Sequence, residues 1–190
     1  MLQDRAQRKT INSSLRIGLC FLVILFAKST LASASVGCEG TALPREIGAE
    51  LRTSYSDWKI VSLEMLSPYE QTIWKDGNAR SCPGIAIGRF TGSTEEVAVN
   101  LVSHADGKLY EQVLLFSKGS PMSHARVILP RTEVASISVI MTMAPGHYRS
   151  SDNQKRIRIR QDSISIAALE KGAIQYYWNG KEFDSIITSE

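Results

Sequence analysis

Apolar and polar residues recur along this chain with two different periods. Between residues 43 and 55 an apolar side chain returns every four positions, which is the spacing of one helix face. The positions concerned are Leu43, Ile47, Leu51 and Tyr55. Pro44 suits the first turn of this predicted helix, because its missing N–H is not needed there.

A second helix is predicted from a start signal rather than from a long period. Ser67 and Glu70 have the spacing of a capping box, and Pro68 between them suits the first helical position. We expect this helix to end near Lys75. The segment between the two helices, from Trp58 to Leu63, is predicted to be a strand.

From Cys82 onward the chain consists of short runs rich in Val and Ile, which favour strands. The predicted runs are 85–90, 96–103, 108–117, 125–129, 135–143, 163–169, 173–178 and 183–188. Asn179 and Gly180 indicate a hairpin between the last two. The whole pattern predicts an α+β fold, with two N-terminal helices packed on a largely antiparallel β-sheet built from hairpins.

The first 34 residues have the layout of a cleavable signal peptide. A basic stretch precedes an apolar run of 11 residues, Ile17 to Ala27, and Ala32 and Ala34 supply the small side chains that a signal peptidase accepts. A membrane-spanning helix needs roughly 20 residues, so this run favours an export signal over an anchor. We expect cleavage after Ala34 and a single exported α+β domain over 35–190, periplasmic or secreted.

A lipid anchor on Cys38 is the alternative, because Val36 and Gly37 precede it as small residues do in lipoproteins. Ser35 argues against this, since a large aliphatic residue is expected at its position.

Removal of the signal peptide changes the charge balance. Five of the 22 Lys and Arg residues and one of the 19 acidic residues lie in it, which leaves 17 basic and 18 acidic side chains. The mature chain is nearly neutral overall, so its net charge indicates neither a nucleic-acid partner nor stable insertion into a membrane.

Two cysteines remain after cleavage, Cys38 and Cys82. In an oxidising compartment a pair of cysteines predicts a disulfide. A disulfide that closes a loop of this length stabilises the fold by roughly 4 kcal/mol. A redox function is disfavoured because the chain has no C-x-x-C motif.

The most distinctive motif is the segment from Pro83 to Val99, with Gly88, Phe90 and Gly92 at its centre. It resembles the FG-GAP or VCBS-type turn, in which aspartates between two strands hold calcium. Arg89, Thr91 and Ser93 occupy the carboxylate positions here. Because calcium needs about six to eight oxygen ligands, we expect a hairpin that has lost its metal, and we expect no cofactor.

The resemblance extends over nearly the whole mature chain. It also includes Leu43 to Ile47, Cys82 to Gly84, and the run from Tyr176 to Lys181. On these motifs the chain is similar to small exported bacterial proteins of unknown function that carry a single degenerate FG-GAP/VCBS-like turn. This resemblance implies a fold and a compartment but no reaction.

Catalytic motifs are absent from the sequence. Three histidines, His104, His124 and His147, lie in or beside predicted turns, and His104 alone has an acidic neighbour at close spacing, Asp106. We interpret all three as exposed loop residues. A glycosidase-type carboxylate pair would have to be assembled by the fold from the acidic residues Asp57, Glu95, Glu96 and Glu111.

Two surface features are candidates for binding. Arg156, Arg158 and Arg160 alternate with Ile157 and Ile159, so the three arginines are predicted to form a basic stripe on one face of a strand. The second feature is aromatic and consists of Tyr176, Tyr177 and Trp178.

These features favour a non-enzymatic exported domain that binds another macromolecule, a protein of the cell envelope, through the arginine strand and the terminal hairpin. An inhibitor or immunity-type function would suit the size and the disulfide. The two alternatives are an envelope glycan hydrolase that uses a carboxylate pair and a calcium-stabilised FG-GAP-like module.

Overall fold

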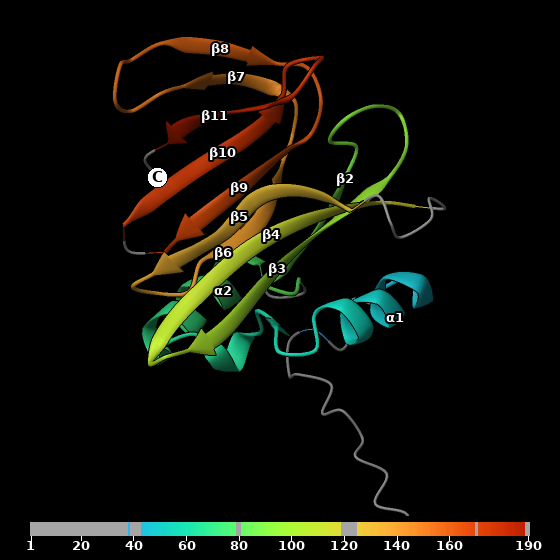
Figure 1. The fold of residues 1–190 in the computed structure, drawn as a ribbon. Helices are drawn as coiled ribbons and strands as arrows, with labels where there is room; N and C mark the ends of the chain where they lie inside the picture. Colours follow the sequence, from blue (N-terminus) through green and yellow to red (C-terminus); the bar gives the residue numbers. More distant parts are fainter. Residues whose placement is uncertain (1–37, 39–42, 79–80, 119–124, 170, 189–190) are drawn as a thin grey trace, which may run out of the picture. The chain divides into compact units, whose positions relative to one another are not determined.

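The computed structural model describes residues 38, 43–78, 81–118, 125–169 and 171–188 (Figure 1). All of them belong to one compact unit, residues 33–190. The predicted signal peptide and its cleavage site after Ala34 lie outside the described residues.

Both predicted helices are present, within a few residues of their expected bounds. α1 spans Arg45–Ser54 and buries Ile47 and Leu51, two members of the predicted apolar stripe. α2 spans Pro68–Asn78, after a single 3-10 turn, η1, at Leu63–Met65. The capping box that begins α2 is confirmed: the Glu70 N–H donates to Ser67 Oγ at 3.3 Å, and the Ser67 N–H donates to Glu70 Oε2 at 2.8 Å.

The strands of the described residues form three antiparallel sheets. Sheet A has the order β1-β3-β4-β5, and β2 also pairs with β3; sheet B has the order β11-β10-β9-β6; sheet C is the pair β7-β8. The bounds in sheet A are β1 Lys59–Ile60, β2 Ile85–Gly88, β3 Glu96–Ala105, β4 Lys108–Ser117 and β5 Arg126–Val134. Those in sheets B and C are β6 Val139–Met143, β7 Gly146–Arg149, β8 Arg156–Ile159, β9 Ser163–Ala168, β10 Gly172–Trp178 and β11 Phe183–Thr188.

The predicted α+β class is wrong, because the protein is mostly β. Its two short helices, 10 and 11 residues long, lie mid-chain rather than forming an N-terminal layer on one sheet. The sequence pattern located most of the strands but missed β7, and it predicted a specific partner only for the hairpin of β10 and β11. Since sheet A is covered on one face by sheet B, the helices are not needed to cover a single large sheet.

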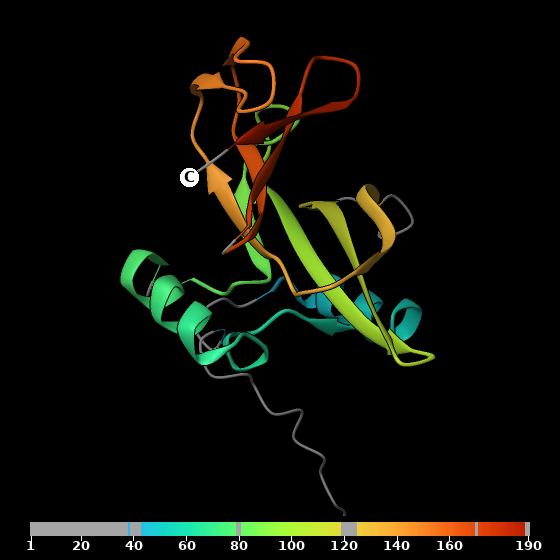
Figure 2. The same ribbon diagram turned by 90° about the vertical axis from the view of Figure 1, so that its left-hand side faces the viewer.

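The core is organised around β3, whose residues from Glu96 to Ser103 are all buried. On one face of sheet A, Val97, Val99 and Leu101 pack with Ile47 and Leu51 of α1. On the other face, Ala98 packs with Ile140, Ile164 and Ile166 of sheet B. Figures 1 and 2 show sheet A between these two layers.

Sheets A and B are also joined by hydrogen bonds along one side. The Ile140 N–H donates to the Pro83 carbonyl at 2.8 Å, and Thr142 Oγ1 donates to the Ile87 carbonyl at 2.9 Å. β6 of sheet B therefore lies beside β2 of sheet A, and the core between the two sheets adjoins this seam.

The predicted disulfide is confirmed. Cys38 and Cys82 are bonded across a sequence separation of 44, and Cys82 is fully buried beside Ile47 and Leu51. The bond ties the segment before α1 to the start of β2, on the face of sheet A that α1 covers.

The close approach of Gly84 to β1 provides a test of this packing. A Cβ on Gly84 would lie 2.4 Å from the Val61 carbonyl oxygen and 2.8 Å from the Val61 nitrogen, and backbone atoms cannot move aside as a side chain can. We expect Gly84→Ala to lower the free energy of unfolding by about 1–3 kcal/mol in urea denaturation. Gly92→Ala is the matched control, because nothing lies within 4 Å of its added Cβ. Equal midpoints for the two variants would contradict this packing.

Candidate functional site

The segment from Pro83 to Val99, which was predicted to resemble an FG-GAP turn, forms a hairpin in which β2 pairs with β3 from Gly88 opposite Glu96 to Ile85 opposite Val99. Phe90 is buried in the core between the sheets. The carboxylate of Glu96 is buried and accepts hydrogen bonds from Thr91 N at 2.7 Å, Thr91 Oγ1 at 2.8 Å and Ser117 Oγ at 3.1 Å. This carboxylate therefore holds the loop in shape through protein hydrogen bonds.

Metal ligands do not gather around this turn. Glu95 is exposed and forms an ion pair with Lys118 at 3.1 Å. Among the residues that the structure describes, no three His, Cys, Asp or Glu side chains are placed to hold a metal ion. The resemblance of the segment from Pro83 to Val99 to an FG-GAP turn remains a prediction.

Glu111 is the other buried carboxylate, and it also has an internal function. It accepts hydrogen bonds from Asn100 Nδ2 at 2.7 Å and from the Ser138 N–H and hydroxyl, each at 3.0 Å. Asn100 Nδ2 also donates to the Ser138 carbonyl at 2.9 Å. This cluster joins β3 and β4 to the residue that precedes β6, so it stabilises the contact between the sheets.

The fold does not bring Glu96 and Glu111 together. Glu111 pairs with Val102, six positions along β3 from Glu96. At about 3.3 Å per residue the backbone positions of the two residues lie about 20 Å apart along the sheet. A glycosidase pair needs a separation of roughly 5 to 10 Å.

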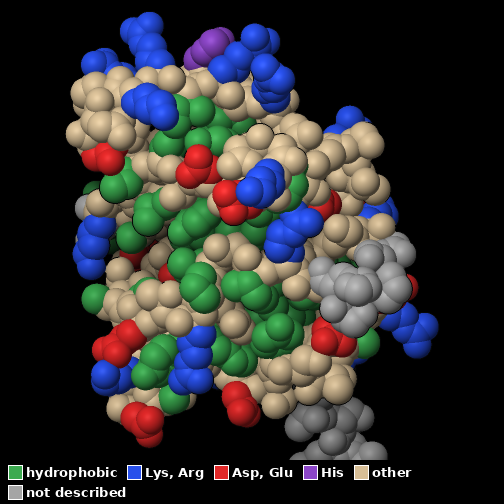
Figure 3. All heavy atoms as spheres, turned by 45° about the horizontal axis from the view of Figure 1, so that its top comes forward, with side chains coloured by type: hydrophobic (Ala, Val, Ile, Leu, Met, Phe, Trp, Pro, Cys, Tyr) green, Lys and Arg blue, Asp and Glu red, His purple; other side chains and the backbone are tan. Residues whose placement is uncertain are grey.

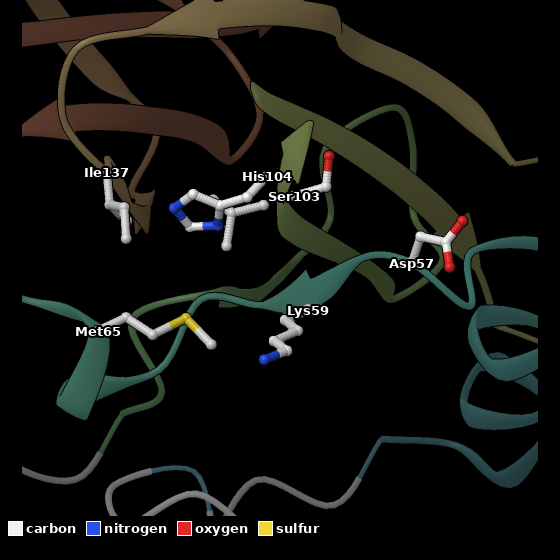
Figure 4. Close-up of a pocket in the computed structure, with 7 residues that line it drawn as sticks. Asp57, Lys59, Met65, Ser103, His104 and Ile137 are labelled. Carbon is white, nitrogen blue, oxygen red and sulfur yellow. The ribbon is translucent and has the colours of Figure 1, made fainter. Parts of the chain in front are cut away.

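His104 lines a cavity of about 510 Å³ at the end of β3 (Figure 4). In Figure 4 its ring lies near Met65 and Ile137, whereas Asp57 lies at the far end of the cavity. The walls combine apolar side chains with single charges from Asp57 and Lys59. Asp106 belongs to the tight turn after β3, with φ 52°, and His124 lies outside the described residues.

The predicted aromatic surface is divided between internal contacts. Tyr176 is half-buried against the core between the sheets, and this burial raises its pKa. Trp178 packs edge-on against Phe183, with ring centroids 5.4 Å apart, and the Arg126 guanidinium lies 4.8 Å from the Trp178 ring centre. These aromatic side chains stabilise the β10–β11 hairpin and its contact with β5.

Tyr177 lies on the opposite face of β10 from Tyr176 and Trp178, because neighbours along a strand alternate. Its hydroxyl donates to Asp184 Oδ2 at 2.9 Å. Burial raises the pKa of Tyr177, and the hydrogen bond and negative charge of Asp184 raise it further. The three aromatic residues therefore do not present one continuous surface.

The arginine strand is part of a hairpin that adds one arginine and one histidine to the prediction. In sheet C, His147 lies opposite Arg158 and Arg149 lies opposite Arg156. Because side chains two apart on a strand share a face, these four residues project together. We call them the basic face; all four are exposed, and Figure 3 shows Lys, Arg and His side chains gathered at this end of the molecule.

The basic face lacks acidic partners. The ion pairs recorded for the described part of the chain are Lys108–Glu133 and Lys118–Glu95, and neither involves the basic face. Arg160 follows the end of β8 and is also exposed and unpaired among the described residues.

The basic face lies on a strand pair that follows an interruption in strand pairing. β6 and β9 pair as far as Met143 opposite Ser163, and β7 and β8 resume at Gly146 opposite Ile159. Two residues intervene on one side and three on the other, so the pairing is interrupted between the two strand pairs. β7 and β8 therefore form a separate two-stranded sheet beyond the end of sheet B.

His147 and Arg149 were missed because Pro145 and Gly146 look like the end of a strand. The signal that could have found them is the turn that follows. Ser150 Oγ bonds the Asp152 carboxylate, Asn153 Oδ1 accepts from the Lys155 N–H at 2.9 Å, and Gln154 takes φ 59°. Such Asx-type bonds and a left-handed residue are typical of a hairpin loop.

Comparisons with protein-family models, with curated proteins and with solved structures find no match to this chain. Within the described residues, no helix is long and apolar enough to span a membrane.

Replacing Glu111 distinguishes an internal from a catalytic function of this carboxylate. Glu111→Leu removes the acceptor for Asn100 Nδ2 and for both Ser138 donors while they stay buried, so we expect a loss of about 3 kcal/mol in the free energy of unfolding. Glu95→Gln removes only an exposed ion pair and should cost less than about 1 kcal/mol. A Glu111→Leu protein as stable as the parent would contradict the structural function.

Proposed function

We propose that this chain is an exported, non-enzymatic protein that binds an acidic protein partner in the cell envelope through the basic face. The observation that carries the proposal is the pairing of Arg149 with Arg156, with Arg158 exposed on the same face. Like charges directly opposite each other destabilise a sheet, and no described carboxylate offsets them. An acidic partner would supply the missing counter-charge.

The hydrogen-bond pattern of the hairpin places Arg149 and Arg156 in a closely spaced cross-strand pair. The Ser150 N–H donates at 2.9 Å to the carbonyl of Lys155, the residue opposite it, so the next pair, Arg149 with Arg156, is one that exchanges no hydrogen bonds. Pairs that exchange no hydrogen bonds have the closest side chains, with Cα atoms about 4.5 Å apart. Arg149 and Arg156 therefore have the closer of the two cross-strand Cα spacings of an antiparallel pair.

Segregation of charge also supports a specific site. The predicted mature chain has 17 basic and 18 acidic residues; the basic face holds three of the arginines, so the remainder has 14 basic and 18 acidic residues and a net negative charge. Such contrast steers association and fixes the orientation of a partner.

Export is supported by the disulfide between Cys38 and Cys82, because such bonds persist in oxidising compartments. The non-enzymatic part of the proposal is supported by the internal hydrogen bonds that occupy Glu96 and Glu111. An inhibitor or immunity-type protein is the kind of function that a small, disulfide-bonded domain with one charged docking face would suit.

Capture of the partner tests the proposal directly. We expect crosslinking in living cells, followed by mass spectrometry, to recover a protein with an acidic surface. The triple variant Arg149→Gln, Arg156→Gln, Arg158→Gln should reduce its recovery at least tenfold, since each lost charge-assisted contact costs about 1.5–3 kcal/mol. The control Arg45→Gln, Arg52→Gln, Lys75→Gln changes the net charge equally at exposed helix positions. Equal loss in both variants would refute the basic face as the site.

A single charge reversal separates stability from binding. Arg149→Glu replaces a repulsive cross-strand pair with an attractive one, so we expect the free energy of unfolding to rise by about 0.2–1 kcal/mol while partner recovery falls. Thermal denaturation together with the crosslinking assay measures both. A variant that is less stable than the parent would show that Arg149 supports the fold instead.

A further inference from the structure

The outer edge of β8 is an unpaired strand edge within the described chain. Sheet C contains just β7 and β8, and β8 pairs with β7 alone. Because the Ser150 N–H donates to the carbonyl of Lys155, the residue opposite it, the residues of β8 whose backbone groups point away from β7 are Arg156 and Arg158. Figure 1 shows β8 as the outermost strand of the hairpin.

Three of the other sheet edges, those of β5, β11 and β6, are obstructed. β5 carries Pro130, which has no N–H to donate to an added strand. On β11 the Ile187 carbonyl already accepts from the Ser151 N–H at 2.9 Å. β6 is hydrogen-bonded to the segment from Pro83 to Ile87.

On β8 the same two residues provide both the free backbone groups and the cationic side chains. An antiparallel strand added to this edge would place two of its residues directly opposite Arg156 and Arg158. Those residues are two positions apart, and their side chains lie on the same side of the sheet as the guanidinium groups. The geometry matches a strand with acidic residues at alternate positions.

We propose that the partner docks as an extended segment that adds an antiparallel strand to the edge of β8, with alternate acidic side chains facing Arg156 and Arg158. This inference rests on the proposed function, since it specifies how the acidic partner is held. Backbone hydrogen bonds provide affinity in strand addition, and alternate side chains provide specificity. The unpaired cations of the basic face select the acidic segment.

The test uses the oxidised full chain and synthetic peptides. One short peptide alternates glutamate with valine and threonine, and a second has the same composition with the glutamates in one block. We expect the alternating peptide to bind at least tenfold more tightly in calorimetric titration. Arg156→Gln with Arg158→Gln should remove this preference, and Arg45→Gln with Arg52→Gln should keep it.

Backbone methylation of the peptide tests strand pairing apart from charge. Residues opposite Arg156 and Arg158 direct their own N–H groups toward β8, so N-methylation of the glutamates should weaken binding about tenfold or more. N-methylation of the intervening residues places the methyl groups on the outer edge and should leave the affinity within about threefold of the parent peptide.

The outcomes separate this inference from the proposed function. If both methylated peptides bind like the parent and the arginine variants do not, strand addition is wrong but an acidic protein partner still stands. If no peptide binds while crosslinking still recovers an acidic protein through the basic face, strand addition is also wrong. If phosphatidylglycerol vesicles or polyphosphate bind the basic face more tightly than the alternating peptide, a protein partner is refuted together with strand addition.

Discussion

Burial of β3 on both faces is the constraint on which the rest of this structure depends. A strand that is buried on one face alone shows an alternating pattern, whereas β3 is buried continuously from Glu96 to Ser103. α1 covers one face and sheet B covers the other. Because the disulfide and the seam between β2 and β6 both lie beside β3, they hold the two covering layers in place.

This arrangement requires polar groups inside the molecule, and the protein satisfies most of them internally. Glu96 closes the loop after β2, and Glu111 binds Asn100 and Ser138 where the sheets meet. Two carboxylates that look available for chemistry in the sequence are thus committed to the architecture. Replacing either carboxylate is expected to lower the free energy of unfolding, because buried donors would lose their acceptors.

The basic face shows the opposite behaviour. Other arginines lie against aromatic rings, Arg126 on Trp178 and Arg131 on Tyr110 at 4.2 Å. Those on β7 and β8 are instead set opposite one another on a projecting hairpin. The contrast between satisfied interior charges and crowded, unpaired exterior ones is the basis for interpreting this hairpin as a docking element.

Local features were well determined by the sequence itself. The apolar stripe of α1, the capping box at Ser67 and Glu70, and the disulfide each depend on near neighbours or on a single possible pairing. What only the tertiary structure decided is which strands face each other, and this is why the α+β expectation failed. Strand pairing between distant segments leaves no periodic trace, so neither the cover over β3 nor the alignment of Arg149 with Arg156 could be read before the chain was folded.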